Sequence, residues 1–324
     1  MNESGYAVGI DLGGSKIYAV VTDPENRVLG RAKLPTNPET IPQKTVADMF
    51  IAAMEAVHES GINWKDIRYV GAAVPSPVNP ETGECIHAVN LGWKNISMKE
   101  LLKKQFGKEI TLSNDANAGL LGEHYCGAAR GFRSSVGYFI GTGLGGGIII
   151  NGKLHSGQKG FAGELGHCTI RVGGRRCGCG RKGCVEAYCS KIAFVKSLKK
   201  EVFKRGETTM LPEDKFNENS RNIKSKYLAR AYESGDPVVR NVVDKGLRML
   251  GAAAAAVCTA LAPECVVLGG GFTEAMGENI LPPFQASFRE HLFGISPEDI
   301  HIRLSTLGDD AVAVGAAILA KGIE

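Results

Sequence analysis

The chain has 324 residues, of which 44% are hydrophobic and 22% are charged, close to the soluble globular average, so disordered and fibrous classes are excluded. Its formal net charge is +4, from 38 basic and 34 acidic residues, an excess too small to indicate a nucleic-acid-binding stripe. Glycine is the outlier: 42 residues, or 13%, is about twice the usual share of roughly 7%.

The length suggests two domains, at about 150 residues per domain. The longest apolar stretch, residues 249–262, is shorter than the roughly 20 residues that a bilayer requires. The N-terminus lacks the cationic and apolar regions of a secretory signal. Nine cysteines, four of them between Cys177 and Cys189, favour a local metal cluster over a disulfide scaffold. We therefore expect a soluble, cytoplasmic protein without a membrane partner.

An internal repeat links two glycine-rich segments. Residues 5–17 (GYAVGIDLGGSKI) and 137–149 (GYFIGTGLGGGII) match without a gap at seven positions. Each is an apolar run, a glycine turn and a second apolar run, which predicts a β-hairpin. Coincidence between two glycine-rich hairpins is the alternative, but so many matches favour a duplication. In this alignment Asp11 of the first copy faces Gly143 of the second.

The remaining elements follow in chain order. After the first copy we expect two strands within 19–34, a helix over 46–60, a strand over 67–74 and a strand over 109–112. After the second copy we expect a cysteine-rich loop, a charged helical region over 191–233, an alanine-rich helix ending at Leu261, a strand over 265–268 and a helix from Val312. Alternating strands and helices predict mainly parallel sheets covered by helices on both faces. Two related halves predict two domains with a cleft between them, a common place for ligands.

The glycine loops suit phosphate binding, because backbone N–H groups without a nearby Cβ can approach a phosphate closely. Neither loop has the Walker pattern or the dinucleotide fingerprint. Asp11 beside phosphates predicts an intervening Mg²⁺, since a bare carboxylate would repel them, and Ser15 or Lys16 could add a donor. A third cluster, Gly269-Gly270-Gly271, lies between a strand and a helix. It could hold the adenosine part of a nucleotide or form an ordinary turn.

Asn114 and Asp115 stand where a predicted strand gives way to a helix. A carboxylate there could accept the proton of an attacking hydroxyl during phosphoryl transfer. An asparagine could donate a hydrogen bond to one oxygen of a ligand and accept one from a hydroxyl. Taken alone, the pair is better explained as a helix N-cap, for which both residue types are favoured.

Four residues have the spacing of a metal site: His167, Cys177, Cys179 and Cys184 form H-x9-C-x-C-x4-C. Three thiolates and one imidazole are a tetrahedral Zn²⁺ set, and a closed shell of four protein ligands indicates structural zinc. Free thiols in a loop are the alternative. They are disfavoured because an arginine- and glycine-rich loop has little core of its own to hold it.

The motifs DLGGSK, GTGLGGG and VVLGGG, in this order, resemble those of sugar kinases with the actin, hexokinase and Hsp70 ATPase fold, which is ribonuclease H-like. More narrowly they resemble the ROK family of repressors, open reading frames and sugar kinases. The resemblance implies duplicated α/β domains, placed here at 1–117 with 309–324 and at 118–308, the second carrying the zinc loop. It also implies an ATP-dependent hexose kinase, similar to bacterial glucokinases, and a homodimer or homotetramer.

The resemblance also assigns roles to individual residues. Asp115 becomes the base that deprotonates the C6 hydroxyl of glucose. The sugar contacts fall on Asn90, Asn114, Glu164, His167 and Glu186. The contacts to ATP and Mg²⁺ fall on Asp11, Gly13, Gly14, Ser15, Lys16, Thr142, Gly143, Gly269, Gly270 and Gly271. His167 would serve both the sugar and the zinc ion.

Other activities remain open within the family, namely kinases of N-acetylglucosamine, N-acetylmannosamine and fructose. Ser15 replaces a common threonine, and PSPVN (75–79) replaces the usual PGPVD, which makes Ser76 and Asn79 relevant to sugar choice. The rival class is a sugar-responsive repressor, which carries a helix-turn-helix domain ahead of the first glycine loop. We expect none here, because eight residues precede Gly9. A non-catalytic sugar-binding protein is disfavoured by the presence of both Asp11 and Asp115.

Overall fold

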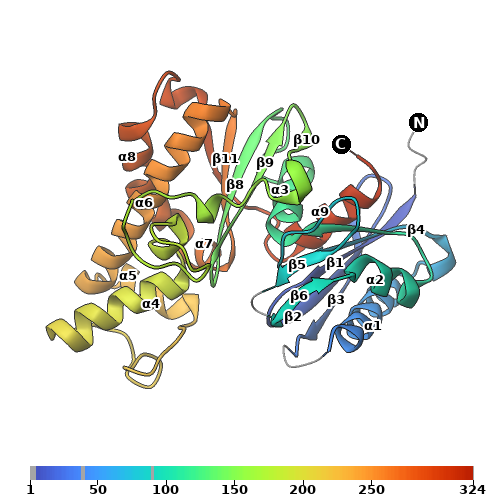
Figure 1. Cartoon of the computed structure of the whole chain (residues 1–324), viewed down its shortest axis with the longest axis horizontal. Coiled ribbons are helices and arrows are strands. Elements are labelled where there is room, and N and C mark those ends of the chain that lie inside the picture. The colour runs from blue at the N-terminus through green and yellow to red at the C-terminus, as the bar shows by residue number, and fades with distance from the viewer. Residues whose placement is uncertain (1–4, 38–40, 89–90, 324) are drawn as a thin grey trace. The chain divides into compact units, whose positions relative to one another are not determined.

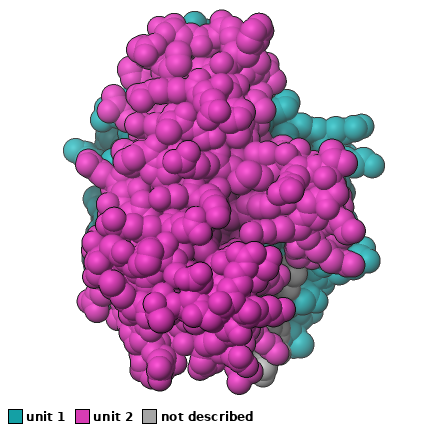
Figure 2. All heavy atoms as spheres, turned by 90° about the vertical axis from the view of Figure 1, so that its left-hand side faces the viewer, with its two compact units in different colours: residues 1–135, 147–163, 306–324 teal, residues 136–146, 164–305 magenta. Residues whose placement is uncertain are grey.

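The computed structural model describes residues 5–37, 41–88 and 91–323, and the chain divides into two compact units (Figures 1 and 2). Unit 1 comprises residues 1–135, 147–163 and 306–324, and unit 2 comprises residues 136–146 and 164–305. Residues 118–135 thus group with the N-terminal part of the chain. The domain boundaries drawn from the sequence place them in the second domain, and those boundaries stay a prediction.

Unit 1 is built on a five-stranded sheet with the order β3-β2-β1-β4-β7. Its strands are β1 (Tyr6–Leu12), β2 (Lys16–Thr22), β3 (Val28–Pro35), β4 (Ile67–Val74) and β7 (Ile110–Asn114). Strand β1 pairs antiparallel with β2 and parallel with β4. Unit 1 also contains a two-stranded sheet, β5 (Cys85–Ala88) with β6 (Trp93–Ile96), and several α-helices. The helices are α1 (Pro42–Ser60), α2 (Met98–Phe106), α3 (Asp115–Cys126) and α9 (Asp310–Ala320).

The two faces of the unit 1 sheet pack in different ways. Alternate residues of β1, namely Val8, Ile10 and Leu12, join a hydrophobic core that includes residues of α1 and α2. Side chains alternate between the faces of a strand, so the intervening Gly9 faces the other side. A Cβ at Gly9 would lie 1.8 Å from the carbonyl oxygen of Ala313 in α9. Strand β1 therefore needs glycine here, because the helix backbone occupies the space of a side chain.

A buried carboxylate anchors α3. Glu123 is fully buried, and it accepts hydrogen bonds from the backbone N–H groups of Ala128 (2.8 Å), Thr306 (3.1 Å) and Leu307 (2.9 Å). A buried charge is tolerated when hydrogen bonds replace its lost hydration. These bonds join α3, whose first residue is Asp115, to the segment that leads into α9.

The second sheet has the order β10-β9-β8-β11-β12. Its strands are β8 (Ser135–Ile140), β9 (Leu144–Ile150), β10 (Lys153–Leu154), β11 (Cys265–Gly269) and β12 (His301–Leu304). The helices of unit 2 are α4 (Lys191–Lys199), α5 (Ser225–Glu233), α6 (Pro237–Leu261), α7 (Gly271–Met276) and α8 (Leu281–His291). None of the helices within the described residues is long and apolar enough to span a membrane.

The strand orders support the predicted duplication but correct its alignment. In both sheets the third, second and first strands of a half lie side by side, followed by its two later strands. The hairpin turns, however, fall at Gly13–Ser15 and at Gly141–Gly143. The second turn thus lies four residues earlier than the ungapped repeat places it. Asp11 lies on a strand, whereas the aligned Gly143 lies in a turn, so this pair of residues is not structurally equivalent.

The charged region over 191–233 is only partly helical, which corrects the expectation of a continuous helical segment. Helix α4 continues into a short π-helix over Lys200–Lys204, and regular helix resumes only at Ser225. The intervening loop is tied to α6 by Asp236, whose carboxylate accepts hydrogen bonds from the Thr209 hydroxyl and the Met210 N–H, both at 2.6 Å. The predicted helix ending at Leu261 is confirmed as the C-terminal part of α6.

Candidate active site and metal centre

The first glycine loop is a short turn between β1 and β2. The Gly13 N–H donates to the Lys16 carbonyl at 2.9 Å, and the Thr36 hydroxyl donates to the Gly13 carbonyl at 2.9 Å. Gly14 and Ser15, at the tip of the turn, are exposed. Hydrogen bonds at Gly13 therefore stabilise the turn, while its tip remains accessible, as a phosphate-binding turn requires.

Asp11 lies two residues before this turn, near the end of β1, and is only 8% exposed. Burial first, and the Asp115 carboxylate second, raise the pKa of Asp11 to about 7. Lys16 opposes the shift, but its ammonium forms an ion pair with Asp309, just before α9. Lys33 also pairs with Asp309, at 3.2 Å. Three carboxylates and two lysines thus interact at this end of unit 1, and a divalent cation near Asp11 and Asp115 would relieve the repulsion between them.

The strand-to-helix junction at Asn114 shows the expected cap. The Asn114 side-chain oxygen accepts hydrogen bonds from the N–H groups of Ala116 (2.9 Å) and Asn117 (3.1 Å). Its amide nitrogen donates to the Ser76 carbonyl at 3.3 Å. Asp115, the first residue of α3, is partly exposed. The cap thus occupies the Asn114 oxygen and leaves Asp115 as the carboxylate presented at the helix start.

Ser76 and Asn79, the departures from the family pattern, both have roles within their own loop. Ser76 is 2% exposed; its hydroxyl donates to the Pro77 carbonyl and accepts from the His87 N–H. The Asn79 side chain accepts from the N–H of Glu81 at 2.9 Å. These hydrogen bonds stabilise the turn, and the relevance of the two residues to sugar choice stays a prediction.

The second glycine loop joins β8 to β9 and leaves Thr142 exposed. The N–H of Lys191, at the start of α4, donates to the Gly141 carbonyl at 3.1 Å. The Leu144 N–H donates to the Glu186 carboxylate at 3.0 Å. A Cβ at Gly143 would lie 2.4 Å from that carboxylate. Glu186, assigned to the sugar by resemblance, therefore also fixes the end of this loop.

The third glycine cluster forms the turn from β11 to α7. Gly270 has a φ of +88°, and a Cβ there would lie 2.7 Å from the Ile140 carbonyl oxygen. Glycine is needed at this position for both reasons. Gly269 is buried, whereas Gly271 is exposed and an added Cβ there would meet open space. The turn accounts for the first two glycines, and contact with a nucleotide stays a prediction for all three.

The four predicted metal ligands lie together in unit 2. Their ligand atoms all lie within 4.8 Å of one another, one atom from each of His167, Cys177, Cys179 and Cys184. Cys179 Sγ is 3.7 Å from Cys184 Sγ, and Cys177 Sγ is 3.7 Å from His167 Nδ1. Tetrahedral Zn–S bonds of about 2.3 Å place two sulfur ligands about 3.8 Å apart. The donor set and its spacing therefore fit a closed zinc site.

The predicted sugar residues of unit 2 adjoin this cluster. His167 Nε2, the nitrogen away from Cys177, lies 4.0 Å from the Glu164 carboxylate. Glu186 lies on the other side, with Oε1 3.3 Å from Cys177 Sγ. Burial raises the pKa of Glu164 against the opposing effect of His167. Glu164 precedes a short 3₁₀ turn over Leu165–His167 rather than a regular helix.

Two residues complete the comparison between the predicted and the observed site. Sequence patterns missed Asp309, because it pairs with a lysine 293 positions away and only the local Gly-Asp-Asp sequence marks it. Asn90, the remaining predicted sugar ligand, lies outside the described residues.

Comparisons with known proteins agree with this architecture. A structure of a ROK family glucokinase from Streptomyces griseus, in complex with glucose and AMPPNP, has a TM-score of 0.85 and 32% identity, covering 98% of this chain and 100% of that one. The predicted fold class is thereby confirmed: the chain has duplicated α/β domains of the actin and hexokinase type. The model of the ROK family matches residues 7–323. The chain belongs to the ROK family.

Relatives in this family include both kinases and repressors. A glucokinase of Halalkalibacterium halodurans is 31% identical over 319 residues, covering 97% of this chain and 94% of the relative. A xylose repressor of Caldicellulosiruptor bescii is 29% identical over 313 residues, covering 96% of this chain and 77% of the relative. Family membership alone therefore leaves two classes of activity, and the residues of the site have to separate them.

Proposed function

We propose that this ROK sugar kinase transfers the γ-phosphoryl group of ATP to the C6 hydroxyl of glucose, with Asp115 as the general base. The observation that carries the proposal is the partly exposed carboxylate of Asp115 at the start of α3, which interacts electrostatically with the buried Asp11 beside the first glycine loop. Kinase chemistry needs a carboxylate at the acceptor and a cation-binding group at the phosphates. The similarity to glucokinases supports glucose as the first choice.

The proposed reaction uses the two units for different tasks. Asp115 accepts the hydroxyl proton as the sugar oxygen forms its bond to the γ-phosphorus and the bond to ADP breaks. The exposed tips of the glycine loops, at Gly14, Ser15 and Thr142, would contact the phosphates. Mg²⁺, held through Asp11, would neutralise charge on the phosphates. Glu164, His167 and Glu186 would orient the sugar hydroxyls.

We expect Mg²⁺- and sugar-dependent release of ADP from ATP, strongest with glucose. A coupled assay across glucose, mannose, fructose, N-acetylglucosamine and N-acetylmannosamine measures kcat/KM for each sugar. A higher kcat/KM with an N-acetylhexosamine or with fructose would retain the kinase and correct the substrate. Absence of turnover with every sugar, from protein that still binds a sugar by calorimetry, would favour a repressor or a non-catalytic sugar-binding protein instead.

We also propose that His167, Cys177, Cys179 and Cys184 bind one structural Zn²⁺ per chain. The ion would hold the loop that carries His167 and would leave Nε2 of that ring directed toward Glu164 and the sugar. A cytoplasmic location and a homo-oligomeric state stay predictions.

For the zinc site, elemental analysis is expected to find about one zinc per chain, and Cys184→Ser is expected to lose the metal. A structural site contributes folding energy, so the variant should also unfold at a lower temperature. Cys168→Ser is the matched control, because this exposed thiol neighbours His167 but is not among the four clustered ligands. Equal zinc content in both variants would exclude the assigned set.

A further inference from the structure

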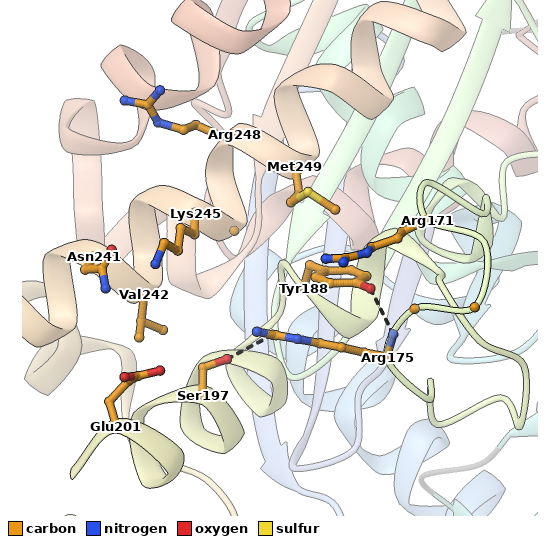
Figure 3. A pocket seen from close by; sticks show the side chains of 13 residues that line it. Arg171, Arg175, Tyr188, Ser197, Glu201, Asn241, Val242, Lys245, Arg248 and Met249 are labelled. Atoms are coloured by element: carbon orange, nitrogen blue, oxygen red, sulfur yellow. Dashed lines mark hydrogen bonds between the residues drawn. The ribbon is translucent and has the colours of Figure 1, made fainter. Parts of the chain in front are cut away.

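Unit 2 contains a cavity that none of the residues assigned above to ATP, sugar or zinc lines. Its volume is about 720 Å³, within the range of roughly 300–1,000 Å³ typical of small-molecule sites. The walls come from the loop between His167 and Cys177, from Tyr188, from the end of α4 and the π-helix that follows it, and from the middle of α6 (Figure 3). The lining residues are Arg171, Gly173, Gly174, Arg175, Tyr188, Ser197, Glu201, Asn241, Val242, Lys245, Gly246, Arg248 and Met249.

The lining is strongly cationic. Four of its side chains are basic and one, Glu201, is acidic. The Glu201 carboxylate is already paired with the guanidinium of Arg205, at 2.8 Å. Figure 3 shows Arg175 and Lys245 extending from opposite walls toward the space between α4 and α6, with Arg248 directed away from it. The cavity thus offers positive charge that the Glu201 carboxylate does not neutralise.

One of the basic groups is held in position by contacts within the cavity. The Arg175 guanidinium lies 4.9 Å from the centre of the Tyr188 ring, and it donates a hydrogen bond to the Ser197 hydroxyl at 2.9 Å. The Tyr188 hydroxyl in turn accepts from the Arg175 backbone N–H at 2.8 Å. An arginine fixed by stacking and hydrogen bonding loses little entropy when it binds an anion.

The rest of the surface suits a ligand with a carbon skeleton. Tyr188 and Val242 are buried residues that line the cavity beside Met249. An aromatic ring and aliphatic groups can pack against a sugar or similar ring, whereas guanidinium and ammonium groups bind phosphate. We propose that this cavity binds a small organic phosphate at a site separate from the reaction centre. The proposal does not depend on the kinase activity, because it concerns binding in unit 2 alone.

The test is calorimetric titration of the whole chain, without ATP, using glucose 6-phosphate and inorganic phosphate as probes. The double variant Arg171→Ala/Lys245→Ala removes two lining cations, and Lys226→Ala/Arg230→Ala removes two exposed cations of α5 that do not line the cavity. We expect the double variant to bind glucose 6-phosphate at least tenfold more weakly, and the α5 variant to bind as the unmodified chain does. Kinase turnover in the absence of added phosphate should be the same in all three proteins.

Two results would overturn the proposal. The first is equal affinity for glucose 6-phosphate in the two variants, which would place any bound phosphate elsewhere, as at a product site. The second is inorganic phosphate binding as tightly as the sugar phosphate, which would remove the organic part of the ligand. Loss of kinase turnover with retained, lining-dependent binding would contradict the proposed function while leaving this site intact.

Discussion

Replacing Asp115 with asparagine is expected to lower kcat by roughly 10²- to 10⁴-fold, the range typical for loss of a general base. The amide cannot accept the proton of the C6 hydroxyl at neutral pH. The variant should fold normally, because an amide oxygen can also accept the hydrogen bond that the Ala116 N–H donates to the Asp115 carboxylate at 2.8 Å. The KM for the sugar should change little, since the groups proposed to contact the sugar are retained.

The measurement is steady-state kinetics with calorimetric sugar binding on the same preparations. Asp66→Asn serves as the matched control, because Asp66 is exposed and lies in a short turn before β4. Full activity in Asp115→Asn would remove the base assignment. A loss of sugar affinity that equals the loss of kcat/KM would make Asp115 a binding residue instead. Both results would differ from global damage, which a lower unfolding temperature would reveal.

The four residues proposed as zinc ligands were the most predictable part of the site. They lie within eighteen residues of one another in the chain, so spacing alone constrains which atoms can meet, and the structure places all four together. The N-cap role of Asn114 was equally predictable, because the preference for asparagine at an N-cap depends on local sequence alone. In contrast, the pairing of Lys16 with Asp309 and of Glu123 with Thr306 and Leu307 joins distant parts of the chain. No local pattern encodes such contacts.

The sequence repeat correctly predicted two halves with related strand order, but it aligned the residues of the two halves incorrectly. Strands over 67–74 and 265–268 follow from short apolar runs, and the structure has them as β4 and β11. The glycine matches misplaced the second turn because glycines occur for several physical reasons. Gly13 lies in a turn, whereas Gly9 lies within a strand and permits close approach of α9. Matching glycines in the two copies therefore did not occupy equivalent positions in the fold.

The glycine excess is explained as much by α9 as by the phosphate loops. A Cβ at Gly71 in β4 would lie 1.9 Å from the Ala316 carbonyl oxygen, and one at Gly122 in α3 would lie 2.2 Å from that of Ala311. Helix α9 thus contacts two strands and a helix through backbone atoms. Three-dimensional packing creates this requirement, whereas the sequence patterns pointed to loops alone.

Gly315, within α9, is the position where this packing gives the largest expected effect on stability. A Cβ there would lie 1.7 Å from the Ala118 carbonyl oxygen and 2.9 Å from the Gly122 backbone nitrogen, both in α3. In an exposed helix, Gly→Ala is stabilising by about 1 kcal/mol, because alanine has the higher helix propensity. Here we expect Gly315→Ala to destabilise the fold by about 3 kcal/mol or more, the upper range of overpacking, because neither helix backbone can rotate away.

The expected loss corresponds to a fall of about 6–12 °C in the unfolding temperature, at roughly 2–4 °C per kcal/mol. Thermal unfolding of Gly315→Ala is best compared with that of Gly271→Ala, since Gly271 is also helical but has no atoms within 4 Å of an added Cβ. The control should unfold within about 2 °C of the unmodified chain, given a propensity effect of at most about 1 kcal/mol.

An unchanged or raised unfolding temperature in Gly315→Ala would mean that α3 and α9 separate at little cost. Because α3 begins at Asp115 and α9 follows Asp309, such freedom would also weaken the case for a rigidly held base. The packing of α3 against α9 therefore bears both on the stability of the fold and on the position of the proposed base.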